Sequence, residues 1–244
     1  MKPLRIAMWS GPRNISTAMM RAWENRPDTS VWDEPLYGHF LARTGIDHPL
    51  RKEILETCET DWRKVIADLT GPIPGGKPIQ FQKHMTQHML EHIDRGWMAD
   101  VTNCFLIRHP DQVIASYALK RDQVTAADLG FDRQAEIFEQ VCQSTGAIPP
   151  VLDARDVLTN PEGMLSKLCS VLGIKFSPSM LAWRTGLRDS DGVWARHWYQ
   201  AVEQSTGFAP YREKEISLSD EHQTIAEAAK SFYARLYKHR LLPD

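Results

Sequence analysis

A short segment near the N-terminus combines a glycine turn, an arginine and two hydroxyl side chains, which are groups that bind phosphate or sulfate. Residues 9–17 follow an apolar run and precede a run with helical spacing. At the start of a helix, free backbone N–H groups and the positive end of the helix dipole attract anions. We therefore expect an anion site here, and its candidate ligands are Gly11, Arg13, Asn14, Ile15, Ser16 and Thr17.

The same segment lacks the lysine of a Walker A loop. That loop needs Gly-Lys followed by Ser or Thr, whereas Ile15 precedes Ser16 and Thr17 here. Binding of a nucleoside triphosphate with Mg²⁺ is therefore disfavoured, and Arg13 can supply positive charge instead of the lysine. Taken alone, the segment is equally well explained as a tight turn followed by a helix capped by its hydroxyl residues.

A second pair of residues suited to anions lies later in the chain. Arg108 ends an apolar run, and Ser116 lies about two turns into an expected helix that opens at Pro110. A planar guanidinium and a hydroxyl that converge on one face suit a phosphate monoester. An arginine paired with Asp111, next to an ordinary helical serine, would give the same pattern.

Alternating strands and helices must position these residues. We predict strands at residues 4–9, 30–32, 79–82, 103–107 and 150–152. Helices are predicted at residues 15–25, from 110, at 131–145, from 161 and at 220–239, with a helical insertion between 49 and 69. This order is typical of βαβ units, so we predict an α/β fold with three α/β/α layers and a central parallel sheet.

Composition and charge exclude several classes of protein. The 244 residues carry a formal net charge of −2, and 42% of them are hydrophobic. A disordered chain is excluded, and so is binding to nucleic acid or to a membrane through bulk charge. We expect a single domain over residues 1–244, with a core at about 4–176 and a C-terminal helical lobe at 177–244.

Cysteine and histidine spacing gives no metal motif. Four separated cysteines without a CxxC pair indicate free thiols in a reducing compartment, so we expect a cytoplasmic protein. His88 and His92 lack the carboxylate of an HExxH motif, and we expect them on a surface or in a groove. No apolar stretch is long enough to span a membrane.

Together, the two anion motifs resemble those of the sulfotransferases that use 3′-phosphoadenosine 5′-phosphosulfate (PAPS). The family's first loop reads approximately P-[KR]-S-G-T-T, where this chain has residues 12–17. Its second motif matches Arg108, Pro110 and Ser116, and a third stretch matches at residues 156–174. The resemblance implies a P-loop kinase-like architecture. The first loop would hold the 5′-phosphosulfate, and Arg108 and Ser116 would hold the 3′-phosphate.

The chain departs from the family pattern in two places. Asn14 and Ile15 replace Ser-Gly, so we expect backbone that avoids positive φ at these two residues. The family's R-K-G-x-x-G-x-W segment, which also grips the 3′-phosphate, has no clear counterpart. Its candidate substitutes are Arg184, Arg188 and Arg196.

The resemblance also implies a base that takes a proton from the acceptor. Glu34 stands just past the second expected strand, where several family members place a glutamate base; a carboxylate paired with Arg13 is the structural alternative. Cytosolic members carry a histidine base and a lysine after the third strand. The corresponding Lys83 and His84 are adjacent here, which is one residue closer than in those members. We expect Glu34 as the base, His84 as its rival and Lys83 as a charge stabiliser.

The expected function is transfer of a sulfuryl group from PAPS to a hydroxyl or amine of a small-molecule acceptor. We expect no metal, nucleic acid or membrane partner. The acceptor pocket is expected from residues 36–69 and 122–131. Two alternatives stay open: a P-loop-like kinase or nucleotide hydrolase, and a non-catalytic binder of phosphorylated metabolites. The sequence leaves the acceptor and the oligomeric state open.

Overall fold

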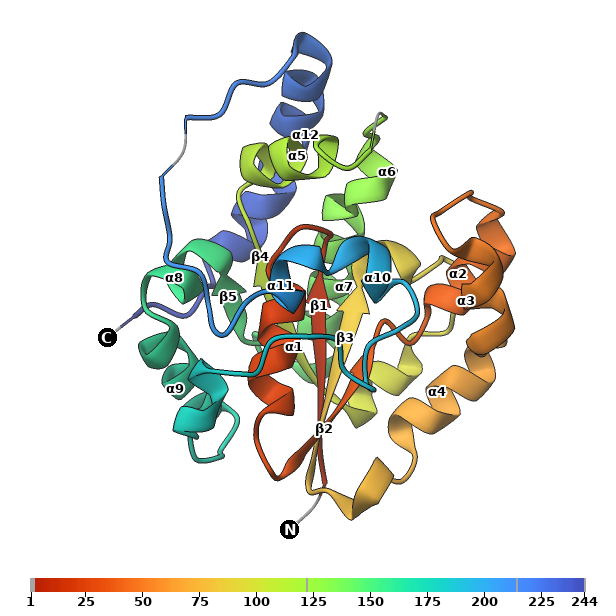
Figure 1. Ribbon diagram of the computed structural model, residues 1–244, viewed down its shortest axis with the longest axis vertical. Helices are drawn as coiled ribbons and strands as arrows, with labels where there is room; N and C mark the ends of the chain where they lie inside the picture. The colour runs from red at the N-terminus through yellow and green to blue at the C-terminus, as the bar shows by residue number, and fades with distance from the viewer. Residues whose placement is uncertain (1–2, 122, 214, 244) are drawn as a thin grey trace.

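A parallel sheet forms the centre of the molecule (Figure 1). The computed structural model describes residues 3–121, 123–213 and 215–243. Within these residues the sheet has five strands in the order β2-β3-β1-β4-β5, and every strand pair is parallel. The strands are β1 (Leu4–Ser10), β2 (Thr29–Asp33), β3 (Ile79–Met85), β4 (Thr102–Ile107) and β5 (Val151–Asp153). The predicted α/β fold with a central parallel sheet is confirmed.

Helices cover both faces of this sheet. The longer ones are α1 (Ser16–Glu24), α2 (Tyr37–Thr44), α4 (Trp62–Thr70), α5 (Pro110–Ala118), α7 (Phe131–Thr145), α9 (Pro161–Val171) and α12 (Asp220–Tyr237). The shorter ones are α3 (Arg51–Thr57), α6 (Ala126–Leu129), α8 (Ala154–Thr159), α10 (Ala195–Trp198) and α11 (Gln200–Glu203). The described residues also form the 3₁₀ turns η1 (Pro74–Gly76), η2 (Thr86–His88), η3 (Gly96–Asp100) and η4 (Pro178–Leu181). Among the described residues, no helix is long and apolar enough to cross a membrane.

Alternation along β1 divides the core between the two faces. Ile6 and Met8 pack in one cluster with α1 and α9, whereas Ala7 and Trp9 pack in another with α7, α4 and α12. Successive side chains of a strand point to opposite faces, so each face of β1 needs its own cover. The all-apolar core run of β1 is therefore the pattern of a strand buried on both sides.

The third strand is longer than the sequence predicts. β3 continues to Met85, so Lys83 and His84 lie within the strand and not after it. Lys83 is paired in register with Met8 and His84 with Trp9. The two side chains therefore point to opposite faces of the sheet.

The C-terminal segment returns to the sheet twice. In Figure 1, α10 and α11 lie across the carboxyl ends of the strands, and α12 runs behind α5. α12 packs against α5 and α7, and the backbone N–H of Leu241 donates to the carbonyl oxygen of Val151. Trp194 and Tyr199 belong to the same core cluster as Ile6. The segment after α9 therefore completes the sheet's cover and its carboxyl edge.

Candidate active site

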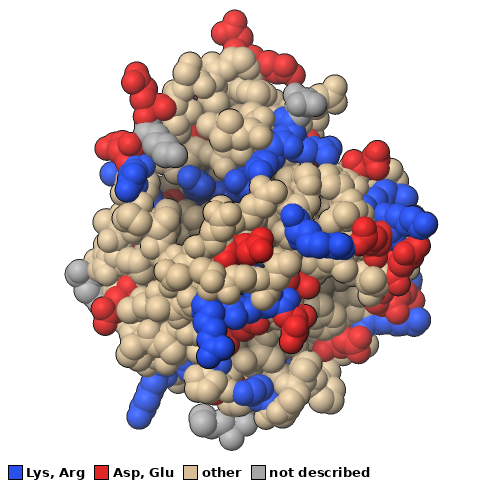
Figure 2. All heavy atoms as spheres, viewed as in Figure 1, with Lys and Arg blue, Asp and Glu red and all other residues tan. Residues whose placement is uncertain are grey.

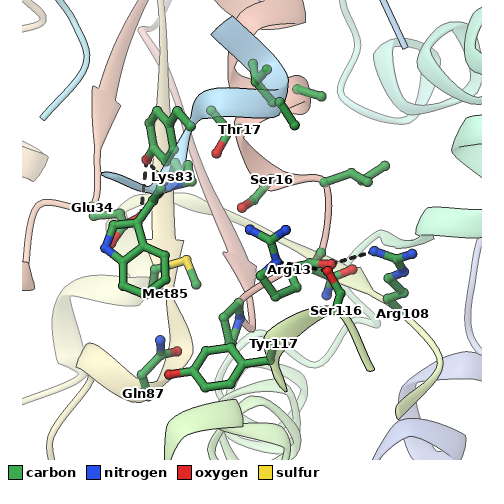
Figure 3. A pocket seen from close by; sticks show the side chains of 18 of the residues that line it. Arg13, Ser16, Thr17, Glu34, Lys83, Met85, Gln87, Arg108, Ser116 and Tyr117 are labelled. Carbon is green, nitrogen blue, oxygen red and sulfur yellow. Dashed lines mark hydrogen bonds and ion pairs between the residues drawn. The ribbon is translucent and has the colours of Figure 1, made fainter. Parts of the chain in front are cut away.

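A cavity of about 220 Å³ opens at the carboxyl ends of the strands (Figure 3). It is lined by most of the residues that the sequence singled out: Arg13, Asn14, Ile15, Ser16, Thr17, Glu34, Lys83, Arg108 and Ser116. Gly11 and His84 are not among its lining residues. We call the part around Arg13, Arg108 and Ser116 the anion end, and the part around Glu34, Lys83 and Tyr199 the carboxylate end.

At the anion end, the two predicted motifs meet. Arg13 Nε donates to Ser116 Oγ at 3.0 Å, and Arg108 Nη1 donates to the backbone oxygen of Arg13 at 2.7 Å. Neither guanidinium has a carboxylate partner among the described residues. Burial lowers the pKa of both arginines, and for Arg108 the charge of Arg13 lowers it further. Two partly desolvated cations without a counter-ion favour an anionic ligand between them.

The first loop holds its shape with backbone in the left-handed region. Arg13 has φ 58° and Ile15 has φ 53°, so the prediction that residue 15 avoids positive φ is wrong. The side-chain amide of Asn14 donates to the carbonyl oxygen of Leu106 at 2.7 Å, which ties the loop to the end of β4. A β-branched residue at positive φ is strained, and such strain persists where the surrounding structure holds it.

This loop leaves the start of α1 uncapped. Ile15 is the N-cap residue, and no side chain accepts a hydrogen bond from the first turn. The first N–H groups of a helix need a partner, so here they are available to an anion. Gly11 has a separate role beneath the loop, because a Cβ there would lie 2.7 Å from the carbonyl oxygen of Leu129. Gly11 therefore permits close packing and lies outside the cavity.

Arg108 is connected to the C-terminal segment. Its Nε donates to Gln112 Oε1 at 3.0 Å, and Gln112 Nε2 donates to the hydroxyl of Tyr211 at 3.2 Å. The predicted substitutes lie elsewhere: Arg196 pairs with Glu53, and Arg188 lies near Glu24. None of Arg184, Arg188 and Arg196 lines the cavity. The segment that approaches the anion end is therefore the one around Tyr211.

At the carboxylate end, Lys83 binds three oxygen atoms. Its Nζ donates to Asp33 Oδ1 at 2.9 Å, to Glu34 Oε1 at 2.5 Å and to the Tyr199 hydroxyl at 2.7 Å. An ammonium has three N–H donors, so Lys83 is fully engaged. Burial alone would lower the pKa of Lys83, but the carboxylates of Asp33 and Glu34 outweigh it and raise that pKa. Lys83 therefore stays charged.

Glu34 is the carboxylate of this end that reaches the cavity. Its side chain is 10% exposed, and burial raises its pKa above the ordinary value, with the charge of Asp33 adding to the effect and Lys83 opposing it. The backbone of Glu34 has φ 43°, and its N–H donates to the carbonyl oxygen of Lys83 at 2.9 Å. A carboxylate with a raised pKa, on strained backbone at the edge of a cleft, has the properties of a general base.

The structure removes His84 from the candidate bases. Its ring is 1% exposed, stacks on Trp9 with centroids 4.4 Å apart, and bonds to Gln82 Oε1. Burial lowers its pKa to about 3, so the imidazole is neutral. Because His84 points to the face opposite Lys83, it cannot reach a molecule in the cavity.

A different histidine lines the cavity. His88 lies in η2, is 3% exposed and stacks on Tyr37 with centroids 4.5 Å apart. Among the described residues its Nδ1 has no hydrogen-bond partner, and it lies 3.9 Å from Glu34 Oε2. Burial lowers the pKa of His88 well below its ordinary value. His88 is therefore a neutral, buried wall of the cavity, which agrees with the groove position, and not the surface position, of the two that the sequence left open.

Comparison with known families decides the identity of the fold. A sequence model described as the sulfotransferase domain matches residues 4–240. The chain belongs to the sulfotransferase family. The match includes the strands, the anion end and the carboxylate end, and it extends through α12.

Solved sulfotransferase structures share this fold. A sulfotransferase from Alicyclobacillus acidocaldarius is 11% identical, with a TM-score of 0.56 over 99% of this chain and 98% of that one. The sulfotransferase domain of the Synechococcus PCC 7002 olefin synthase is 14% identical, with a TM-score of 0.55 over 93% and 94%. The sulfotransferase domain of the curacin biosynthetic pathway is 17% identical, with a TM-score of 0.51 over 93% and 98%.

Two curated relatives carry names of a different kind. A protein of Arabidopsis thaliana named branched-chain-amino-acid aminotransferase-like protein 1 is 35% identical over 238 residues, which are 98% of this chain and 42% of that protein. Its companion, aminotransferase-like protein 2, is 34% identical over 96% of this chain and 41% of that protein. The chain therefore spans less than half the length of these relatives.

Several residues of the cavity have no motif in the sequence. Tyr37, His48, Tyr117, Trp198 and Tyr199 line it as aromatic walls. Tyr37 and His48 fall in the predicted acceptor segment 36–69, whereas none of the described residues in 122–131 lines the cavity. The available signal for Tyr199 was the aromatic cluster at 194–199, which packing alone also explains.

Proposed function

We propose that this protein transfers the sulfuryl group of PAPS to a hydroxyl or amine of a small-molecule acceptor. One observation carries the proposal. The same cavity is lined by two arginines that have no carboxylate partner among the described residues and by a buried carboxylate with a raised pKa. The first feature suits the phosphates and the sulfuryl group of the donor. The second suits the acceptor, which must lose a proton.

The residues of the anion end fit such a donor. The uncapped N-terminus of α1, with the hydroxyls of Ser16 and Thr17, offers donors for the 5′-phosphosulfate. Arg108 and Ser116 offer a guanidinium and a hydroxyl for the 3′-phosphate. Arg13 belongs to the first loop and contacts both members of the second group, because it bonds to Ser116 through its side chain and to Arg108 through its carbonyl oxygen.

Glu34 would act as the base. When bound, PAPS supplies the sulfuryl group, whose bond to the 5′-phosphate oxygen breaks as the bond to the acceptor oxygen or nitrogen forms. Glu34 takes the proton that the acceptor loses. Arg13 and the N–H groups of α1 neutralise the negative charge that remains on the 5′-phosphate. Glu34 and this loop line one cavity, so both steps would occur in the same space.

Lys83 would act on Glu34 and not on the leaving oxygen. All three of its N–H groups donate hydrogen bonds, to Asp33, Glu34 and Tyr199, so none is free to bind PAPS. Its charge lowers the pKa of Glu34 and so opposes the effect of burial, which raises that pKa. We assign Lys83 the role of a positioning residue that holds the base.

Titration with 3′-phosphoadenosine 5′-phosphate (PAP), the product of PAPS, tests the donor half of the proposal. We expect saturable binding to the wild-type protein in a calorimeter, without added metal, and weaker binding of ATP with Mg²⁺. The proposal fails if PAP does not bind at millimolar concentration. Tighter binding of ATP with Mg²⁺ would instead favour a kinase or a nucleotide hydrolase.

A further inference from the structure

The cavity continues into a groove beyond its carboxylate end. His48 lines both spaces, and the groove is formed by residues 47–52 together with Arg121. The hydroxyl of Tyr37 and Nδ1 of His48 are hydrogen-bonded at 2.8 Å, so the same aromatic wall borders both spaces. A molecule whose reacting group lies beside Glu34 can therefore extend past Tyr37 and His48 into the groove.

Arg121 brings a guanidinium to the lining of this groove. Its guanidinium has no hydrogen bond or ion pair with any residue that the structure describes, and its side chain is only partly exposed. Burial, and then the charge of Arg121, lowers the pKa of His48, which places the positive charge near the junction. The arginines of the anion end are likewise without carboxylate partners. Within the described part of the chain, Arg121 is therefore a third cation near the cavity that forms no ion pair with a carboxylate.

The groove as a whole is positively charged. Among the residues that line it, Arg51, Lys52 and Arg121 accompany one carboxylate, that of Asp47; the charge of Asp128, which is not in the lining, also acts on His48. Lys52 lies 3.8 Å from Glu56 and is largely exposed, so its charge is partly compensated and screened. Two guanidinium groups still exceed one carboxylate. On the face drawn in Figure 2, Lys and Arg side chains form a row beneath the part of the molecule that contains α5 and α6.

We propose that the acceptor carries an anionic group, a carboxylate or a phosphate, which Arg121 binds with Arg51 nearby. This inference rests on the proposed function, because it names the class of acceptor for the same cavity. Without such a cation, an anionic acceptor would be repelled by Glu34 and by the phosphates of the donor. The aromatic wall of Tyr37, Tyr117 and Trp198 would contact the body of the acceptor between its two ends.

Direct binding measurements on matched molecules test this proposal without any need for turnover. The probes are 4-hydroxyphenylacetate, 4-hydroxybenzylphosphonate and 4-hydroxyphenylacetamide, together with a panel of small aliphatic hydroxy acids and their carboxamides. Binding to the wild-type protein is measured by ligand-observed NMR, with and without PAP. The variants are Arg121→Ala and, as a matched control outside the cavity and groove, Arg235→Ala.

Where an acid and its carboxamide are compared, we expect the acid to bind more tightly than the carboxamide. Arg121→Ala should weaken the anion about 10- to 100-fold, the size of a charge-assisted contact, and leave the carboxamide unchanged. Arg235→Ala should change neither. The carboxylate and phosphonate arms show which anion fits better.

The proposal is overturned if carboxamides bind as well as acids, if Arg121→Ala keeps the preference for acids, or if nothing in the panel binds. PAP affinity of the same variants is measured in parallel. If the wild-type protein shows no preference for anions but binds PAP, only the acceptor class is refuted, whereas absence of PAP binding to the wild-type protein refutes the proposed function.

Discussion

At the anion end of the cavity, Arg13 and Arg108 have no carboxylate partner in the described structure, whereas at the carboxylate end Lys83 binds two carboxylates and a tyrosine hydroxyl. The first arrangement leaves positive charge for a ligand to neutralise. The second is nearly neutralised within the protein, and it fixes one carboxylate at the edge of the cavity. Under the proposed function, binding of the donor and removal of a proton would fall to different elements, which separate variants can test.

Both ends share strained backbone. Arg13, Ile15 and Glu34 have positive φ, and Leu50 in the neighbouring groove is the remaining described non-glycine residue with this property. All four therefore line the cavity or its groove. Non-glycine residues in this conformation cost free energy and are concentrated at functional sites. The residues with strained backbone therefore lie around the same cavity and groove as the charged residues.

The largest expected effect is at the carboxylate end. Glu34→Gln should lower kcat by about 10²- to 10⁴-fold, because the amide cannot accept the proton. The dissociation constant of PAP should stay close to the wild-type value, since Glu34 is not part of the anion end. Steady-state kinetics and calorimetry on one preparation measure both. His84→Phe, on the opposite face of β3, is the matched control and should retain kcat; if it loses kcat as Glu34→Gln does, the assignment of the base is wrong.

The next largest effect is at the anion end. Arg108→Ala should weaken PAP binding by about 1.5–3 kcal/mol, because it removes a charge-assisted contact. The acid limb of the pH–rate profile at saturating donor should not move, since Glu34 is untouched. Calorimetry gives the affinity, with Arg235→Ala as the exposed control. An unchanged affinity would mean that Arg108 and Ser116 do not hold the donor.

A smaller effect is expected when the hydroxyl of Tyr199, which contacts both Asp33 and Glu34, is removed. The reaction needs ionised Glu34, whose pKa is raised by burial, so the rate should fall with decreasing pH at a higher pH than for an exposed glutamate. The hydroxyl of Tyr199 lies 3.3 Å from Glu34 Oε1 and lowers that pKa. Tyr199→Phe should therefore move the acid limb to higher pH, by up to about one unit. Tyr211→Phe, near the anion end, should leave it in place. A shift to lower pH in Tyr199→Phe would contradict this account.

The smallest effect concerns the strained loop. Ile15→Gly should be more stable than Ile15→Ala by about 1 kcal/mol, because only glycine adopts the left-handed backbone without a steric cost. At residue 18, in the regular part of α1, the order should be reversed: Ala18→Gly should be less stable than the wild-type protein, which has alanine there. Urea denaturation measures the free energy of unfolding for each variant. If both glycine variants are destabilised alike, the loop does not store strain at residue 15.

The sequence predicted the sheet and the anion end because their signals are local. Apolar runs ending at turns gave five strands, and Arg13, Arg108 and Ser116 each follow a strand or enter the helix after it. The carboxyl ends of parallel strands share one edge, so these residues had to lie close together. Their direct contacts still required the structure, because side-chain direction within a loop is not encoded in spacing.

The errors at the carboxylate end have physical causes. The predicted strand ends at residue 82, whereas β3 continues to Met85. The prediction therefore did not include the opposite directions that Lys83 and His84 take within a strand. Tyr199 contacts Asp33 across 166 residues of sequence, and no local pattern reports such a pairing. Ile15 at positive φ contradicts its own preference, and the packing of the loop onto β4 overrides that preference.

Transfer of radiolabelled sulfate from PAPS tests the central claim most directly. The wild-type protein is incubated with labelled PAPS and a panel of small molecules that carry a hydroxyl or an amine, and products are separated from the donor. The account predicts a labelled product, with an equal amount of PAP formed, and a rate that PAP inhibits. PAP binding without any label leaving PAPS would contradict it, because the protein would then be a binder of phosphorylated nucleotides and not a transferase.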